Sequence, residues 1–93
     1  MAYGILTPRF PLGRIVATPG AIALGIDLMP FVRRHHGADW GDELCPDDRE
    51  ANDRALREGS RILSCYRTGG TQRIYIITEW DRSQTTVMLP DEY

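Results

Sequence analysis

The sequence predicts a single α+β domain with the element order β-α-α-α-β-β-β, its helices packed on a mostly antiparallel sheet with a C-terminal three-stranded meander. Two observations predict this fold. Helix-start and helix-stop residues punctuate the first half of the chain, and three runs with a period of two follow in the second half. A chain of 93 residues can bury one hydrophobic core. We therefore expect an extended N-terminal arm over residues 1–12 and a single domain over residues 13–93.

The first elements are predicted from proline, β-branched and capping residues. Two prolines within the first twelve residues prevent a helix in the arm. Residues 14–17 (RIVA) form a short β-branched run, which predicts a strand at one edge of the sheet. Thr18 supplies a hydroxyl at an N-cap, and Pro19 opens a helix that reaches about Leu24.

Two longer helices are expected next. Asp27 is placed to cap a helix over residues 28–36 (LMPFVRRHH), in which the apolar spacing brings His35 to the core side. A third helix begins at Pro46, carries acidic residues in its first turns and ends at Gly59. Its apolar face is thin, so it should lie on the outside of the fold.

The second half of the chain predicts the meander, with strands over residues 61–67, 72–80 and 84–89. A Gly69-Gly70 turn joins the first two strands, because glycine accepts the positive φ angles of a tight hairpin. Both faces of the middle strand carry bulky side chains, so we expect helices to cover one face and the arm or a partner to cover the other. One face holds Ile74, Ile76, Thr78 and Trp80, and the other holds Tyr75, Ile77 and Glu79.

Charge and composition narrow the classes of partner. A formal net charge of −2 argues against both a strongly basic nucleic-acid binder and a heavily acidic DNA mimic. All eleven basic residues are arginine, which either reflects a GC-rich coding genome or provides guanidinium groups for bidentate capture of carboxylate or phosphate. Cys45 and Cys65 lack a CxxC spacing, so we expect reduced thiols in a cytoplasmic protein. No segment predicts an export signal or a membrane span.

The segment RRHHGADWGDELC, residues 33–45, raises the question of a metal site. Adjacent histidines on a helix point about 100° apart, so they do not converge on one ion, and no second thiol lies near the cysteine of this segment. Pairing of a cysteine with a histidine as nucleophile and base also lacks a supporting signature. We therefore expect no metal, no cofactor and no enzymatic activity. The potential ligands weighed here are His35, His36, Asp39, Asp42, Glu43 and Cys45.

A structural interpretation accounts for the same segment. The two histidines lie in the last turn of a helix that Gly37 stops, and Trp40 fills a gap in the core. Asp39 and Asp42 can accept hydrogen bonds from backbone amides two residues further on.

A second polar cluster, TEWDRSQTT over residues 78–86, predicts a turn that Asp81 caps. Arg82 is expected to pair with Glu79 or with an acid of the first cluster. If the two clusters meet in space, they form an arginine, aromatic and carboxylate patch of the kind that anchors protein interfaces. The candidate binding residues are Arg33, Arg34, Asp39, Trp40, Asp42, Glu43 and Arg82.

The ordered segments ATPGA, DREANDRALREGSRILSCYR, IYIITEWDRSQTTVMLP and the terminal DEY also carry a resemblance. Over residues 13–93 the chain resembles a family of small bacterial proteins encoded on plasmids, integrative elements and prophages, often labelled plasmid-related. Some members are labelled as the methyltransferase subunit of a type I restriction enzyme, but this chain has no glycine-rich cofactor loop and no Asn-Pro-Pro motif. The resemblance implies residence on a mobile element, whose proteins often protect it from host defence or assist its maintenance.

The sequence thus predicts a non-enzymatic protein-binding module of a mobile genetic element. We expect an inhibitor of a host defence system, anti-CRISPR or anti-restriction, that covers a surface of its protein target. The alternative is a nucleic-acid-binding accessory protein of plasmid or phage maintenance, and an enzyme ranks third. In the alternative, phosphates would be contacted by Arg33, Arg34, Arg61, Arg67 and Arg73.

Overall fold

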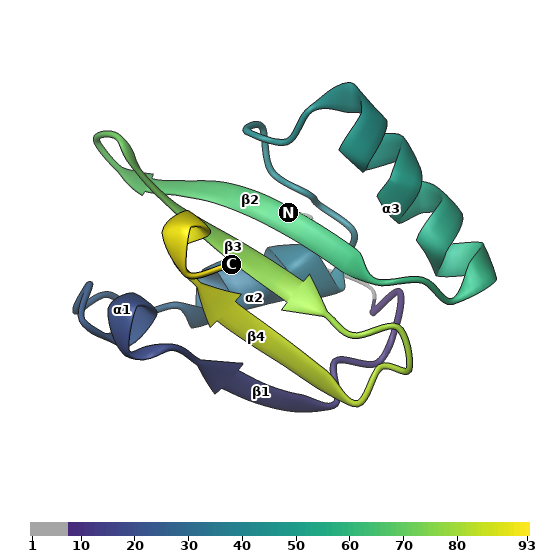
Figure 1. Ribbon diagram of the computed structural model, residues 1–93, viewed down its shortest axis with the longest axis horizontal. Helices are drawn as coiled ribbons and strands as arrows, with labels where there is room; N and C mark the ends of the chain where they lie inside the picture. Colours follow the sequence, from purple (N-terminus) through teal and green to yellow (C-terminus); the bar gives the residue numbers. More distant parts are fainter. Residues whose placement is uncertain (1–7) are drawn as a thin grey trace, which may run out of the picture.

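The fold, seen in a computed structural model that describes residues 8–93, has the predicted order of helices and strands (Figure 1). The α+β prediction is confirmed, with a short C-terminal 3-10 turn in addition. None of the helices formed by residues 8–93 is long and apolar enough to cross a membrane. The elements are β1 (Arg14–Ala17), α1 (Pro19–Ile22), α2 (Met29–His36), α3 (Pro46–Glu58), β2 (Ile62–Gly69), β3 (Gln72–Thr78), β4 (Gln84–Met88) and η1 (Pro90–Glu92).

The four strands form one mixed sheet in the order β1-β4-β3-β2. Strands β2, β3 and β4 pair antiparallel, which confirms the predicted meander. Strand β1 pairs parallel to β4, with Arg14 opposite Gln84, and occupies one edge as expected. The chain therefore leaves one edge of the sheet through the helices and returns at the other edge.

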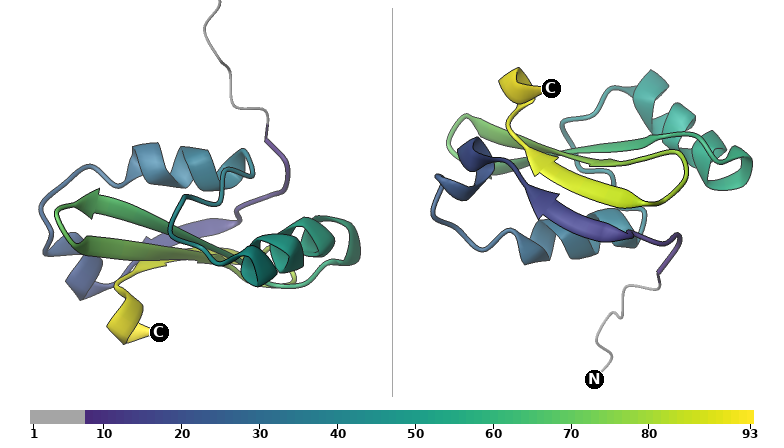
Figure 2. Two further views of the ribbon diagram at one scale, coloured as in Figure 1. Left: turned by 90° about the horizontal axis from the view of Figure 1, so that it is seen from above. Right: turned by 60° about the horizontal axis from the view of Figure 1, so that its bottom comes forward.

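Helix α2 lies over one face of the sheet, and the C-terminal turn lies on the other (Figure 2). On the face covered by α2, Val32 of this helix packs with Tyr66, Ile74 and Ile76 in one core cluster. Each of these side chains is at most 1% exposed. This burial confirms the expectation that helical packing covers one face of the middle strand, and that face is the one with Ile74 and Ile76. Trp80 was expected to extend that face, and this was wrong: β3 ends at Thr78, so Trp80 lies in the following turn.

Helix α3 flanks the β2 edge of the sheet (Figure 1). Its Ala55 packs with Trp40, Leu44, Ile62 and Cys65 in a second core cluster. Gly59 adopts a left-handed conformation with φ +77° and ends α3 as predicted.

The local signals at the first two helices are partly confirmed. The Thr18 hydroxyl accepts from the Ala21 N–H at 3.2 Å and caps α1, although this helix ends at Ile22 rather than near Leu24. The Asp27 carboxylate accepts from the Met29 N–H at 3.0 Å, so it stabilises the start of α2 from two residues upstream.

Residues 1–7 of the expected arm lie outside the described residues. The remainder of the arm, residues 8–12, packs on the domain. Phe10 is buried and meets the imidazole of His35 edge-on, with 5.2 Å between the ring centres. The Arg9 N–H donates to the His36 carbonyl at 3.0 Å.

Candidate functional site

The loop between α2 and α3, residues 37–45, is fixed to the sheet and to α3. Trp40 is only 4% exposed, as predicted, and its indole N–H donates to the Asp53 carboxylate at 3.0 Å. The Trp40 carbonyl accepts from the Cys65 N–H at 3.1 Å, and the Tyr66 hydroxyl donates to the Asp39 carbonyl. The loop thus pairs with the edge of β2 through its backbone.

Glycine and arginine complete this attachment. Gly41 has φ +87°, and a Cβ atom there would lie 2.0 Å from the Cys65 carbonyl oxygen. Arg49 of α3 donates to the carbonyls of Gly41 and Leu44. The close approach of the loop to β2 therefore requires glycine at position 41.

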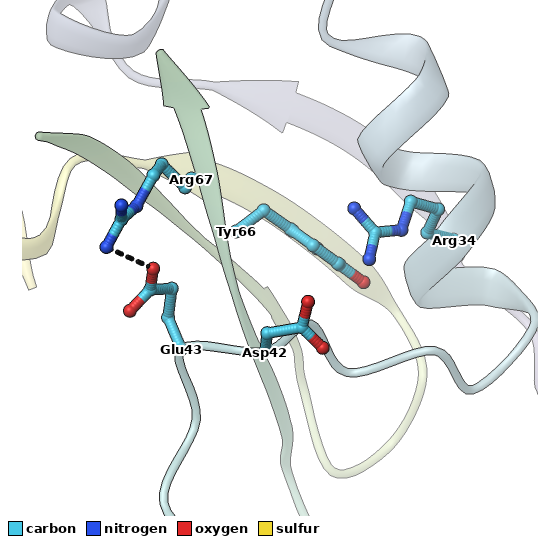
Figure 3. A pocket seen from close by; sticks show the side chains of 5 residues that line it. All are labelled: Arg34, Asp42, Glu43, Tyr66 and Arg67. Atoms are coloured by element: carbon cyan, nitrogen blue, oxygen red, sulfur yellow. Dashed lines mark ion pairs between the residues drawn. The ribbon is translucent and has the colours of Figure 1, made fainter. Parts of the chain in front are cut away.

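The attached loop, together with α2 and β2, borders an open pocket of about 320 Å³ that we call the charged pocket. Figure 3 shows the Tyr66 side chain across its middle, with Arg34 and the Asp42 carboxylate near the Tyr66 hydroxyl and an ion pair on the other side. Its lining side chains are Arg34, Asp42, Glu43, Tyr66 and Arg67.

Arg34 is held in place from two directions. Its Nε and Nη2 atoms donate to the two Asp39 carboxylate oxygens at 2.8 and 3.3 Å. Its guanidinium carbon also lies 4.7 Å from the centre of the Tyr66 ring, a cation–π distance. The hydrogen bond from Arg34 holds the pKa of Asp39 below its usual value, and the same bond raises the pKa of Arg34. Both groups therefore stay charged over the whole physiological range.

The ion pairs of the pocket leave Asp42 without a counter-ion among residues 8–93. Arg67 pairs with Glu43 at 2.7 Å between nitrogen and oxygen. Asp42 forms neither a hydrogen bond nor an ion pair with any of residues 8–93, and it is exposed. The pocket lining holds two guanidinium groups and two carboxylates and is neutral, and Asp42 is the lining charge that the ion pairs among residues 8–93 leave unmatched.

The structure brings some of the predicted binding residues together and separates others. Arg34, Asp42 and Glu43 line the charged pocket, and Asp39 holds Arg34 beside it. Trp40 is buried and supports the loop. Arg33 is exposed on α2 but does not line the charged pocket.

Arg82 lies elsewhere and connects backbone segments. Its guanidinium donates to the Ala55 carbonyl near the end of α3 at 3.0 Å and to the Ser60 carbonyl at 2.6 Å. It also donates to the Glu79 backbone carbonyl at 3.1 Å. The expected pairing with a carboxylate of Glu79 or of the loop is not formed within residues 8–93. The predicted patch of Arg82 with the loop acids is therefore not assembled.

Tyr66 was missed by the sequence reasoning, and Arg67 was named only for phosphate contact. The alternation of strand β2 places Tyr66 on the same face as Ser64, which indicates contact with a helix. No local signal shows that the backbone of residues 39–41 reaches the edge of β2. The three-dimensional structure was therefore needed to place Tyr66 and Arg67 in the charged pocket.

His35 lies inside the core between two hydroxyl groups. Its Nδ1 atom is 2.5 Å from the Ser64 Oγ and its Nε2 atom is 2.8 Å from the Thr78 Oγ1. Burial, with smaller contributions from His36 and Arg82, lowers the pKa of His35 to about 3, so the imidazole is neutral at pH 7. All three side chains are fully buried, which makes them part of the core rather than of a solvent-facing site. Among residues 8–93, no three His, Cys, Asp or Glu side chains group so as to hold a metal ion.

Comparison with protein-family models, with curated proteins and with solved structures gives no match to this chain. The geometry of the charged pocket and of the sheet surfaces is therefore the basis on which function is inferred.

Proposed function

We propose that the chain is a non-enzymatic protein-binding module and that the charged pocket is its recognition site. The supporting observation is that four of the five side chains lining the pocket, all except Asp42, are held in position by contacts within residues 8–93. Arg34 is fixed by Asp39 and Tyr66, and Arg67 by Glu43. A site formed in advance loses little conformational entropy on binding, and arginine and tyrosine are enriched among the residues that dominate interface energies.

The charges favour a cationic group of the partner. Asp42 has no ion-pair partner among residues 8–93, whereas Arg34 is paired with Asp39 and Arg67 with Glu43. A lysine or arginine side chain of a target protein can enter a pocket of about 320 Å³ and pair with Asp42. Tyr66 would lie against its aliphatic part.

The biological setting follows from the resemblance to proteins of plasmids, integrative elements and prophages. A small protein with a positioned charged pocket suits a role as an inhibitor that covers a basic surface of a host defence protein. CRISPR effectors and restriction enzymes carry such surfaces, because both contact the phosphates of nucleic acids.

Charge reversal in the charged pocket tests this function. The chain is expressed in bacteria that carry a CRISPR or restriction system, and phage plating is measured. We expect the wild-type chain to restore plating and the Asp42→Arg variant to lose this effect. Arg54→Glu, on the exposed side of α3, is the matched control and should act like the wild type. Equal activity of all three proteins would contradict the assignment of the pocket.

A second candidate is nucleic-acid binding on the sheet face opposite α2. Tyr75 and Tyr93 meet edge-on there with 5.8 Å between ring centres, and the Arg61 guanidinium lies 5.1 Å from the centre of the Tyr93 ring. Aromatic and arginine side chains on an open sheet face are typical of proteins that stack single-stranded bases. Gel shifts with single-stranded RNA and DNA at increasing salt test this candidate, since phosphate contacts weaken steeply with salt.

A further inference from the structure

Residues 8–93 cover the backbone of one edge of the sheet and leave the backbone of the other edge uncovered. At the β2 edge, the Asn52 side chain accepts from the Leu63 N–H at 3.0 Å and donates to the Leu63 carbonyl at 2.5 Å. The Trp40 carbonyl accepts a hydrogen bond from the next outward-facing N–H on this edge, that of Cys65. The β2 edge is therefore closed to another strand over these residues.

The β1 edge remains open. Arg14 and Thr18 donate their N–H groups to carbonyls at Ser83 and Val87, so alternate residues of β1 turn their backbone groups toward β4. Ile15 and Ala17 turn theirs outward, and no other part of residues 8–93 bonds to them. The edge lacks the lysine, proline or bulge with which proteins commonly block an exposed strand.

Exposed apolar side chains lie on β1 and in the segment that follows it. The described part of the chain has six large hydrophobic side chains that are exposed, and four of them come from the short stretch between β1 and the start of α2. No charged residue interrupts the sequence from position 15 to position 26. Figure 2 (right) shows β1 at the near edge of the sheet, followed directly by α1. The four side chains are Ile15, Ile22, Ile26 and Met29.

We infer that β1 pairs with β1 of a second copy of this chain, antiparallel and around a two-fold axis at Val16. In this register Ile15 of each copy lies opposite Ala17 of the other, and these two pairs form four backbone hydrogen bonds. Arg14, the one charge on the strand, lies opposite the uncharged Thr18 of the other copy, so no like charges meet. A self-complementary patch of this kind is what a two-fold dimer requires.

Pairing would join two four-stranded sheets into one of eight strands. The charged pocket is lined by β2, the strand at the opposite edge of the sheet, so both pockets stay accessible in the dimer. The dimer and the proposed function of the pocket therefore do not depend on each other, and each can be tested separately.

Sedimentation of the purified full chain over a concentration series tests the dimer. We expect a species of twice the 10.5 kDa chain mass for the wild type and a monomer for Ile15→Lys. Tyr93→Lys removes another exposed hydrophobic side chain, which lies against Tyr75 of β3 and away from β1, and should stay dimeric. Circular dichroism checks that each variant is folded. A wild-type monomer up to about 1 mM would overturn the inference, since specific dimers bind more tightly.

Cysteine crosslinking in a Cys45→Ser background tests the register. Across the two-fold axis, Val16 faces its own copy as a non-hydrogen-bonded pair with a Cα separation of about 4.5 Å, which suits a disulfide. Copper phenanthroline should therefore link Val16→Cys chains into dimers. Arg14→Cys is the matched control, because its two copies would lie about 13 Å apart along the strands. Linking of neither variant, or of both equally, would overturn this register.

Discussion

The Nδ1 atom of His35 lies 2.5 Å from the Ser64 hydroxyl oxygen in the fully buried core, and the surrounding bonds fix which atom donates. Thr85 donates its one hydroxyl proton to the Leu12 carbonyl at 2.7 Å. The 2.7 Å bond between Thr78 and Thr85 must then be donated by Thr78. The Nε2–H of His35 therefore donates to Thr78, and Nδ1 accepts from Ser64.

This direction predicts one imidazole tautomer. His35 should be a neutral Nε2–H imidazole at pH 7, because a proton on Nδ1 would leave Ser64 without its acceptor. Imidazole ¹⁵N chemical shifts distinguish the two tautomers directly. Above pH 4 the His35 signals should not titrate, since burial lowers the pKa of His35 to about 3. A neutral Nδ1–H form, or a midpoint near 6.5, would contradict the described core.

The same depressed pKa predicts how stability depends on pH. Between pH 6.5 and about 3 the unfolded chain binds a proton at His35 and the folded chain does not, so the free energy of unfolding falls as the pH falls. The slope contributed by this group is about 1.4 kcal/mol per pH unit. Urea titrations of the wild type and of His35→Gln across this window measure it. The two slopes should differ by this amount, whereas parallel slopes would rule the prediction out.

Replacement of Gly41 tests the contact between the loop and β2. Gly41→Ala should cost about 4 kcal/mol or more, because the new Cβ would overlap the Cys65 carbonyl oxygen. Gly25→Ala is the matched control: Gly25 also has a positive φ, of +70°, but its Cβ would meet nothing within 4 Å. The control should cost only about 1–2 kcal/mol. Thermal and urea unfolding compare the two variants, and equal losses would show that the loop does not approach β2 this closely.

Asn52 tests how the β2 edge is closed. Asn52→Ala leaves the Leu63 N–H and carbonyl without their partners, and we expect a loss of about 3 kcal/mol. The variant should also aggregate more readily, because it uncovers a strand edge. Arg54→Ala, two residues further along α3, should change stability by less than about 0.5 kcal/mol. Urea unfolding and light scattering provide the readouts, and a neutral Asn52→Ala would contradict this role.

The fold was predictable because its elements carry local signals. The Thr18 cap, the left-handed Gly59 and the period-two runs of the meander all act within a few residues of the sequence. Trp80 was misassigned because strand alternation alone does not indicate where β3 ends. The charged pocket was predicted only in part, since Tyr66 and Arg67 join it through contacts between the loop and β2. Contacts between residues so far apart in the sequence depend on the assembled core rather than on local sequence patterns.

Quantitative capture of host proteins tests the central proposal, recognition of a protein through the charged pocket, most directly. The tagged wild-type chain, Asp42→Arg and Arg54→Glu are each used to capture proteins from bacteria with defence systems, and bound proteins are quantified by mass spectrometry. We predict a protein whose recovery falls at least about tenfold with Asp42→Arg, as expected for a central interface residue, and is unchanged with Arg54→Glu. Recovery of every bound protein at the same level by all three chains would contradict the proposal.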